Sequence, residues 1–557
     1  MKFSTVASSS SSQYVYIPMA TFDKHDAHAG ELSSPTKFHD AAGAVEDGGD
    51  DASGDFTGYT RQDRADMSRM GKVQELRRDY RPLSALAFTV ILQGVWEVLL
   101  TATYQGLVDG GPAGLIWSFI WTWFGMSTVI LSLAEMASMA PTAGGQYHWV
   151  SEFSPPSIQK QLSYFTGWMS TLSWQAGTAS GPFLVGTLIQ SSAIVMYPDY
   201  EPTSWQGTLM VIAVTIIVWA LNIWGARGMP MFQNIMLAVH VLGFLAIVIV
   251  FWVLSPRASA QVTFLEFRNE GGWSTTGLAL MVGQISAIYA CICSDSSAHM
   301  AEEIKDAGKT VPNAMVGAYL MNGVVGLIFI ITYMFTITDV TAALEDATGY
   351  PHMWVFSQAV SAGGVAALNT IPIVLIFAGT LTFNLSTSRQ TWAFARDSGL
   401  PFSRWLAKVD KRYQVPANAI TFTCLFTILL SLINIGSDVA FNAIISLNVV
   451  SLMITYVCSI GAVLYRRVRH PELLPACRWS LGRWGVPVNI AGLLYSLHAF
   501  FWCFWPEGTP VAADSFNWAS VMFVGVFLLS LVDYVLRGRK QYRGPVVLVE
   551  GYQSGSW

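Results

Sequence analysis

Two apolar stretches of the sequence, each long enough to cross a membrane, contain polar residues that do not suit a lipid-facing helix. The first stretch has Gln93 and Glu97 on either side of Gly94, and the second has Ser294 and Asp295 directly after Cys293. A carboxylate at mid-membrane costs roughly 2.5 to 3.5 kcal/mol even on insertion-based scales, so such a residue usually faces a cavity. The alternative is a hydrogen bond between helices, which the sequence leaves open.

An interrupted membrane helix could bind a small polar solute. Unwinding frees backbone N–H and C=O groups, and the two half-helix dipoles can hold a carboxylate at one end and a cation at the other. We expect Gly94 and Cys293 to Asp295 to hold the solute through exposed backbone, and Glu97 to balance its positive end. Trp96 would pack over an ammonium group, a contact worth about 0.5 to 2 kcal/mol. An ordinary core tryptophan is the alternative.

The elements that must position these residues are membrane-spanning helices. Hydrophobic residues make up 52% of the chain and charged residues 12%, against about 25% charged in soluble domains. A stretch of about 20 apolar residues at 1.5 Å per residue crosses about 30 Å of hydrocarbon. The sequence predicts an all-α polytopic membrane protein with about twelve such stretches. They are residues 84–108, 114–140, 162–195, 205–224, 231–254, 276–301, 314–337, 366–388, 416–436, 439–465, 486–505 and 516–536.

The basic residues predict the orientation. If the amino terminus lies in the cytosol, the six outer loops contain only Arg257 and Arg268, and the other connections hold most of the arginines and lysines. Positive charge is enriched in cytosolic loops. Both termini are therefore expected in the cytosol.

The chain divides into four expected segments. Residues 1–80 form a polar cytosolic tail expected to be disordered, 81–465 a ten-helix transporter core, 466–540 two further helices, and 541–557 a cytosolic tail. The six cysteines lie mostly inside apolar runs and match no zinc spacing. No phosphate-binding loop, metalloprotease or nucleophile-elbow motif occurs. We therefore expect no catalytic residue, metal, cofactor or nucleic-acid partner.

The two interrupted stretches are the first helices of two successive five-helix blocks. Transporters built from inverted repeats place broken helices in corresponding positions and bind solute at the midplane. Hydropathy and interruption alone, without sequence identity between the blocks, thus predict such a repeat.

Three motifs resemble the fungal amino acid, GABA and choline permease family of the amino acid, polyamine and organocation superfamily. Residues 135–149 are similar to the Gly-Gly-x-Tyr segment near the inner gate, residues 295–303 to the sixth-helix signature, and residues 392–401 to the loop after helix eight. The resemblance covers nearly the whole membrane region. The chain departs from it at Cys293, where relatives usually have glycine, so the pocket could be narrower or differently selective.

This resemblance implies a LeuT-like core of five plus five helices with two peripheral helices, and alternating access driven by an ion gradient. It places His240 in the helix where proton-coupled members carry a titratable group, although a neutral histidine joining two helices is the alternative. It also implies the following site residues: Trp174, Gln175 and Asn384 in the cavity wall, and Gly144, Gly145, Gln146 and Tyr147 at the inner gate.

The sequence thus predicts a proton-coupled permease that imports a small amine-bearing solute. An amino acid such as GABA is favoured over choline, and the plasma membrane is expected. Two other functions stay open, a nutrient sensor with a permease fold and, more weakly, an intramembrane enzyme.

Overall fold

The computed structural model describes residues 58–435, 440–512 and 516–545. These residues belong to one compact unit. In the part of the chain that is described, the regular elements are helices and short 3₁₀ or π turns, together with one isolated bridge between Tyr80 and Ile304. The predicted all-α class is confirmed.

Nine helical segments in the described residues are long and apolar enough to cross a membrane. The spans involved are α2–α3 (Pro82–Gln93, Val95–Thr101), α5 (Gly111–Met139), α7 (Pro156–Met196), α8 (Ser204–Trp224), η1–α9 (Ala226–Gly228, Met229–Leu254), α14 (Ala307–Thr336), α17 (Ala362–Arg396), α20 (Ala440–Arg469) and α22–α23 (Ala519–Asp533, Arg539–Gln541, joined by η5 at Tyr534–Gly538). The chain is a polytopic membrane protein.

Shorter apolar helices occupy other predicted spans. They are α11–α12 (Thr276–Gly283, Ile285–Cys291) and α19 (Ala417–Ser431, continued by η2 at Leu432–Ile435). The remaining predicted span is occupied by the 18-residue α21 (Gly485–Trp502). Length and composition alone do not establish these three as crossings, so the count of twelve stays a prediction.

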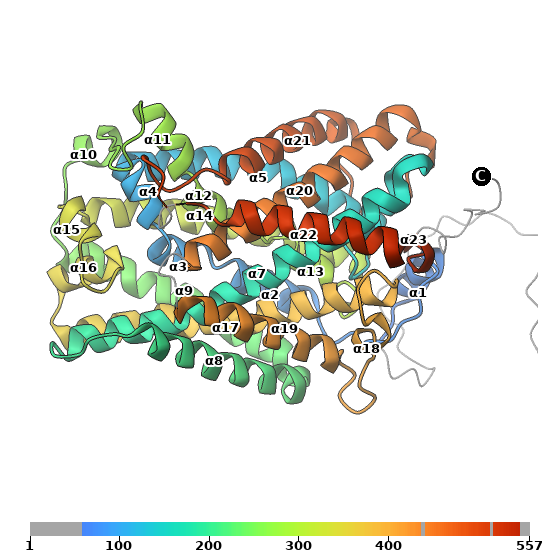
Figure 1. The fold of residues 1–557 in the computed structure, drawn as a ribbon, viewed down its shortest axis with the longest axis horizontal. Coiled ribbons are helices and arrows are strands. Elements are labelled where there is room, and N and C mark those ends of the chain that lie inside the picture. Colours follow the sequence, from blue (N-terminus) through green and yellow to red (C-terminus); the bar gives the residue numbers. More distant parts are fainter. Residues whose placement is uncertain (1–57, 436–439, 513–515, 546–557) are drawn as a thin grey trace, which may run out of the picture. The chain divides into compact units, whose positions relative to one another are not determined.

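Short helices cap the two ends of the helix bundle (Figure 1). Helices α4 (Tyr104–Val108), α10 (Ala260–Leu265), α15 (Val340–Leu344) and α16 (Pro351–Ala359) gather at one end. Helices α1 (Arg61–Arg69), α6 (Gln146–Phe153) and α18 (Ser403–Leu406) belong to connections at the other end, as do η3 (Pro471–Leu473) and η4 (Gly482–Trp484). The site lies between these ends.

Gly94 interrupts the first span. It ends α2 and begins α3 with φ 45° and ψ 50°, a left-handed conformation that glycine adopts without steric cost. The predicted break is therefore confirmed.

The sixth span is also interrupted. Helix α12 ends at Cys291, residues 292–295 are not helical, and the four-residue α13 (Ser296–His299) follows. Cys293 has φ 67°, which costs an L-residue roughly 1 to 2 kcal/mol relative to ordinary backbone. This is the position at which the resemblance leads one to expect glycine, and the backbone explains that preference.

The interrupted first span is enclosed by other helices, since α2 packs against α9, α14 and α17. By contrast, α9 exposes Leu242, Leu245, Ile249 and Val253 along one side. Such an apolar face suits lipid contact. The packing places the interrupted segments inside the bundle.

Part of the amino-terminal tail is ordered, contrary to expectation. Residues 1–57 lie outside the described residues, but Gly58–Tyr80 contains α1 and is tied to the bundle. Asp63 caps helix α14 by accepting from the backbone N–H groups of Asp306 and Ala307, both at 2.9 Å. The low apolar content of this segment suggested disorder, but hydrogen bonds and ion pairs hold it.

Candidate functional site

A small cavity of about 70 Å³ lies at the two helix interruptions. Of the predicted solute-binding residues, Gly94, Glu97 and Cys293 line it. The remaining wall comes mainly from α7 and α17, through Gly177, Ser180, Gly181 and Leu184 and through Leu375, Ile376, Gly379, Thr380 and Phe383. The structure therefore brings the two interruptions to one cavity.

Glu97 and His240 form a buried pair beside this cavity. His240 Nδ1 lies 2.7 Å from Glu97 Oε1, and the side chains are 1% and 4% exposed for His240 and Glu97 respectively. Both residues were predicted separately, one for the solute and one for coupling. Their contact joins these two roles at one place.

The ring nitrogen His240 Nδ1 has two possible hydrogen-bond partners, Glu97 and Trp96. Trp96 Nε1 also lies 3.2 Å from His240 Nδ1. One ring nitrogen cannot donate to Glu97 and accept from Trp96 at once. In either arrangement Glu97 Oε2 and His240 Nε2 have no hydrogen-bond partner in the described part of the chain, although both are buried. The pair thus keeps hydrogen-bonding capacity for a proton or a solute.

Trp96 itself occupies the core. Its ring packs 5.5 Å from the ring of Phe329 and 6.4 Å from that of Phe244, and it is fully buried. It is not among the residues lining the cavity. The structure thus corresponds to the core-tryptophan alternative, and the expected position over an ammonium group does not fit.

Asp295 also departs from its expected role. It accepts hydrogen bonds from Gln146 Nε2 and, at 2.7 Å, from the Tyr456 hydroxyl, and it does not line the cavity. It therefore ties the unwound sixth span to α6 and α20. Neighbouring Ser294 is buried and its hydroxyl has no partner within the described residues; it too lies outside the cavity lining.

The three residues expected in the cavity wall lie on the expected helices but face elsewhere. Trp174 packs on the ring of His299 at 4.8 Å. Gln175 donates to hydroxyls of α17 and α19, and Asn384 accepts from Asn222 at 3.1 Å. A better signal was available in span three, where small residues recur at the helical spacing of Gly177, Ser180 and Gly181.

A larger hollow of about 690 Å³ lies toward the end of the bundle that holds α4 and α15. Tyr289 lines both the hollow and the small cavity, and its hydroxyl lies 2.9 Å from Ser180 Oγ. The contact joins α12 to α7 between the two spaces. Side chains therefore restrict the passage from this end.

The opposite end is closed by the segment Gly144–Tyr147. Gly145 has φ 52°, and a Cβ atom there would lie only 2.8 Å from the His299 ring. Tyr147 donates from its hydroxyl to Asp397 at 3.0 Å. Glycine is thus required at position 145 by backbone shape and by close approach, and the role of Gly144, Gly145, Gln146 and Tyr147 as the inner gate stays a prediction.

Ion pairs reinforce this closure, and we refer to them together as the inner joint. They are Lys72–Asp397, Arg69–Glu152 at 2.6 Å, Arg396–Glu302 at 2.7 Å and Arg389–Glu303 at 2.6 Å. Burial alone would raise the pKa of Asp397, but Lys72 and Arg396 hold that pKa below its ordinary value. Arg396 likewise outweighs burial and lowers the pKa of Glu302. Both groups are therefore ionised near neutral pH.

A metal centre has no support in the described ranges, where no three His, Cys, Asp or Glu side chains are grouped to hold one. The candidate site thus consists of an interrupted helix pair, a His–Glu pair and two constrictions. Such an arrangement can bind a small polar solute and exchange a proton.

Comparison with known proteins identifies the family. A family model described as amino acid permease matches residues 82–528. The rice protein Amino-acid permease BAT1 homolog is 30% identical over 528 residues, covering 92% of this chain and 99% of its own. Two proteins of Saccharomyces cerevisiae, a choline transporter and a GABA-specific permease, are each 26% identical and cover 86% of this chain and 85% of their own. The chain thus belongs to the amino acid permease family, whose members are transporters and not enzymes.

Proposed function

We propose that this permease imports a small amine-bearing solute together with a proton, and that an amino acid such as GABA is its substrate ahead of choline. The names of the relatives supply these candidate solutes. The observation that carries the proposal is the buried Glu97–His240 pair at the cavity, with Glu97 Oε2 left unpartnered.

Charge balance favours a zwitterion with a proton. An ionised Glu97 beside a neutral His240 leaves one uncompensated negative charge in a low-dielectric site, which is costly. One proton on the pair gives a neutral site, and a zwitterionic amino acid then binds without adding net charge. A quaternary ammonium solute would itself neutralise Glu97 and need no proton. Coupled proton uptake therefore fits an amino acid better than choline.

The two ends of the cavity support alternating access. Tyr289 and Ser180 form the constriction toward the larger hollow, and the inner joint closes the other end. We infer that Gly144, Gly145, Gln146 and Tyr147 act as the inner gate. The arginine and lysine distribution supports cytosolic termini, and the family resemblance supports the proposal of a plasma-membrane location.

The test is radiolabelled uptake of GABA, other amino acids and choline into permease-deficient yeast, with and without a protonophore. Saturable, protonophore-sensitive uptake of an amino acid is expected. Glu97→Gln should abolish concentrative uptake, and His240→Ala should remove the dependence of uptake on external pH. A matched control is His352→Gln, because His352 is also buried and bonds Asn369 but does not line the cavity.

Two results would contradict the proposal. Unchanged kinetics in Glu97→Gln would remove that carboxylate from solute binding. An intact pH dependence in His240→Ala, at a normal surface level of the protein, would remove His240 from the proton path.

A further inference from the structure

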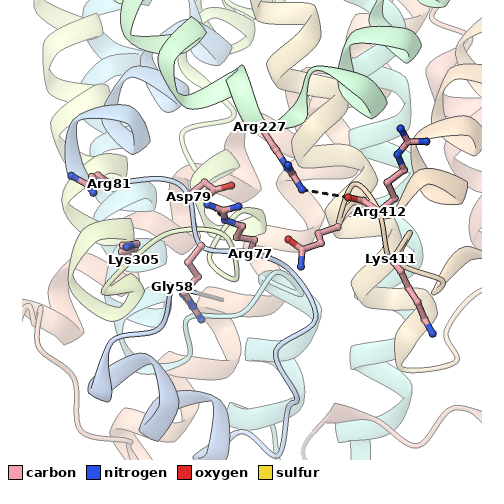
Figure 2. A pocket seen from close by; sticks show the side chains of 10 residues that line it. Gly58, Arg77, Asp79, Arg81, Arg227, Lys305, Lys411 and Arg412 are labelled. Carbon is pink, nitrogen blue, oxygen red and sulfur yellow. Dashed lines mark hydrogen bonds and ion pairs between the residues drawn. The ribbon is translucent and has the colours of Figure 1, made fainter. Parts of the chain in front are cut away.

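A basic hollow of about 510 Å³ lies beside the start of α2 (Figure 2). It shares no lining residue with the solute cavity. Its lining comes from the segment before α2, the turn after α8, the chain after the sixth span and the connection before α19. The residues are Gly58, Arg77, Arg78, Asp79, Arg81, Arg227, Lys305, Lys411, Arg412 and Gln414. Segments far apart in sequence therefore contribute cations to one concave surface.

The charges of this hollow are poorly balanced. Seven of its lining residues are arginine or lysine, and Asp79 is its one carboxylate. Arg77 pairs with Asp79 at 2.8 Å, and Arg78 pairs with Asp63 at 3.3 Å. Within the described ranges the other five cations have no carboxylate at ion-pair distance. Gathering like charges is unfavourable unless water or an anion compensates them.

The types of cation in the hollow indicate which kind of anion it can accept. Arg227 reaches across to the backbone carbonyl of Arg412 at 3.5 Å (Figure 2). The Arg412 guanidinium lies over the Tyr413 ring. The donors thus comprise arginine forks, which suit phosphate oxygens, and lysine point charges. A positive-inside bias requires basic loops but does not require them to converge on one hollow.

An apolar neighbour connects this surface to the lipid-facing side. A smaller hollow of about 270 Å³ shares Arg227 and Arg412 and is otherwise lined by Ile223, Trp224, Ala226 and Tyr413. Trp224 is 61% exposed at the end of α8. Tryptophan and tyrosine are enriched where helices leave the hydrocarbon. A headgroup in the basic hollow would therefore have its acyl chains near an apolar surface.

We propose that the basic hollow binds a multiply phosphorylated headgroup of the inositol phosphate type. The same chemistry could come from a phosphoinositide in the adjoining leaflet or from a soluble inositol phosphate. The lipid source rests on the proposed orientation, which places this face in the cytosol, where anionic lipids attract basic surfaces. The bound anion would link the segment before α2 to the ends of α8 and α19.

The experiment measures binding to the purified full-length protein in phosphatidylcholine nanodiscs. One arm adds phosphatidylinositol 4,5-bisphosphate to the disc, a second adds soluble inositol trisphosphate, and a third uses phosphatidylserine at equal charge. The test variant is Arg227→Gln/Lys305→Gln/Lys411→Gln. The matched control is Arg404→Gln/Arg469→Gln/Arg483→Gln, which removes three exposed cations that do not line the hollow.

We expect the phosphorylated headgroup to bind more tightly than phosphatidylserine, and the test variant to weaken binding by about 100-fold. The control should change affinity by less than about threefold. Tighter binding of the lipid than of the soluble headgroup would assign the leaflet as the source, and equal binding would assign the soluble compound. Both results support the site.

Three results would overturn the proposal: no binding of either phosphorylated probe, no preference over phosphatidylserine, or equal losses in the test and control variants. If the triple variant does not fold, the single changes Arg227→Gln and Lys411→Gln carry the comparison. Because binding is measured without transport, its failure is distinguishable from failure of the proposed solute import.

Discussion

The Lys72–Asp397 ion pair provides the most direct test of how the inner joint is stabilised. The two side chains are 4% and 5% exposed. Removing one partner of a buried pair usually costs 3 to 5 kcal/mol, because the other charge is left uncompensated. In Lys72→Met, Asp397 would keep its hydrogen bond from Tyr147, so we expect the lower end of that range, about 3 kcal/mol.

Hydrogen exchange of two backbone amides measures this loss. Tyr80 N–H donates to Glu303 O at 3.0 Å, and Lys305 N–H donates to Tyr80 O at 2.9 Å, so both amides exchange when the joint opens. A loss of about 3 kcal/mol corresponds to roughly 150-fold faster exchange. Lys309→Met removes a nearby exposed lysine and should leave the exchange unchanged.

The double variant completes the test. Lys72→Met/Asp397→Asn removes both charges, so its exchange should be slower than that of Lys72→Met alone. If Lys72→Met exchanged these amides at the rate of the Lys309→Met control, the ion pair would not stabilise the closed inner end.

Three further predictions concern the cavity, the constriction and the joint. Because Cys293 has a positive φ, the free energy of unfolding of Cys293→Gly, measured by thermal unfolding, should exceed that of Cys293→Ala by about 1 kcal/mol. Because Cys291 is helical, Cys291→Gly should instead be less stable than Cys291→Ala. Tyr289→Phe loses the contact with Ser180, and its solute affinity in equilibrium binding should fall by up to about tenfold, with no change in Ser192→Ala. The pKa values of Asp397 and Glu302 are lowered in the folded protein, so both carboxylates stabilise the inner joint fully above about pH 4.5. This stabilisation is lost as the pH falls through their folded-state pKa values. Amide exchange at the joint, corrected for intrinsic rates, should thus be constant between pH 5 and 7.5 and rise in stronger acid; a rise between pH 7 and 6 would contradict this sign.

The sequence predicted the two helix interruptions because their signals are local. Gly94 in a long apolar run and polar residues after Cys291 are each visible without any tertiary contact. Glu97 and His240 were each singled out for the same reason, as ionisable groups in apolar helices. Their pairing was not predictable, because the two residues are 143 positions apart and lie on different helices, α3 and α9.

Helical facing explains why the three residues expected in the cavity wall do not line the cavity. Trp174, Gln175 and Asn384 lie on the expected helices, but a few residues' difference along a helix turns a side chain to another neighbour. The amino-terminal segment 58–80 differs from its prediction for another reason. Its order comes from Arg78 donating to the carbonyls of Ala301 and Ile304, and from Lys72, contacts that hydropathy does not register.

The bridge between Tyr80 and Ile304 has a mechanical consequence. Main-chain hydrogen bonds join the residue that precedes Arg81 and Pro82 to the end of the interrupted sixth span. Because only Arg81 lies between this bridge and α2, a tilt of one interrupted helix is transmitted to the other. One extra residue inserted after Tyr80 would therefore weaken the coupling between the two helices.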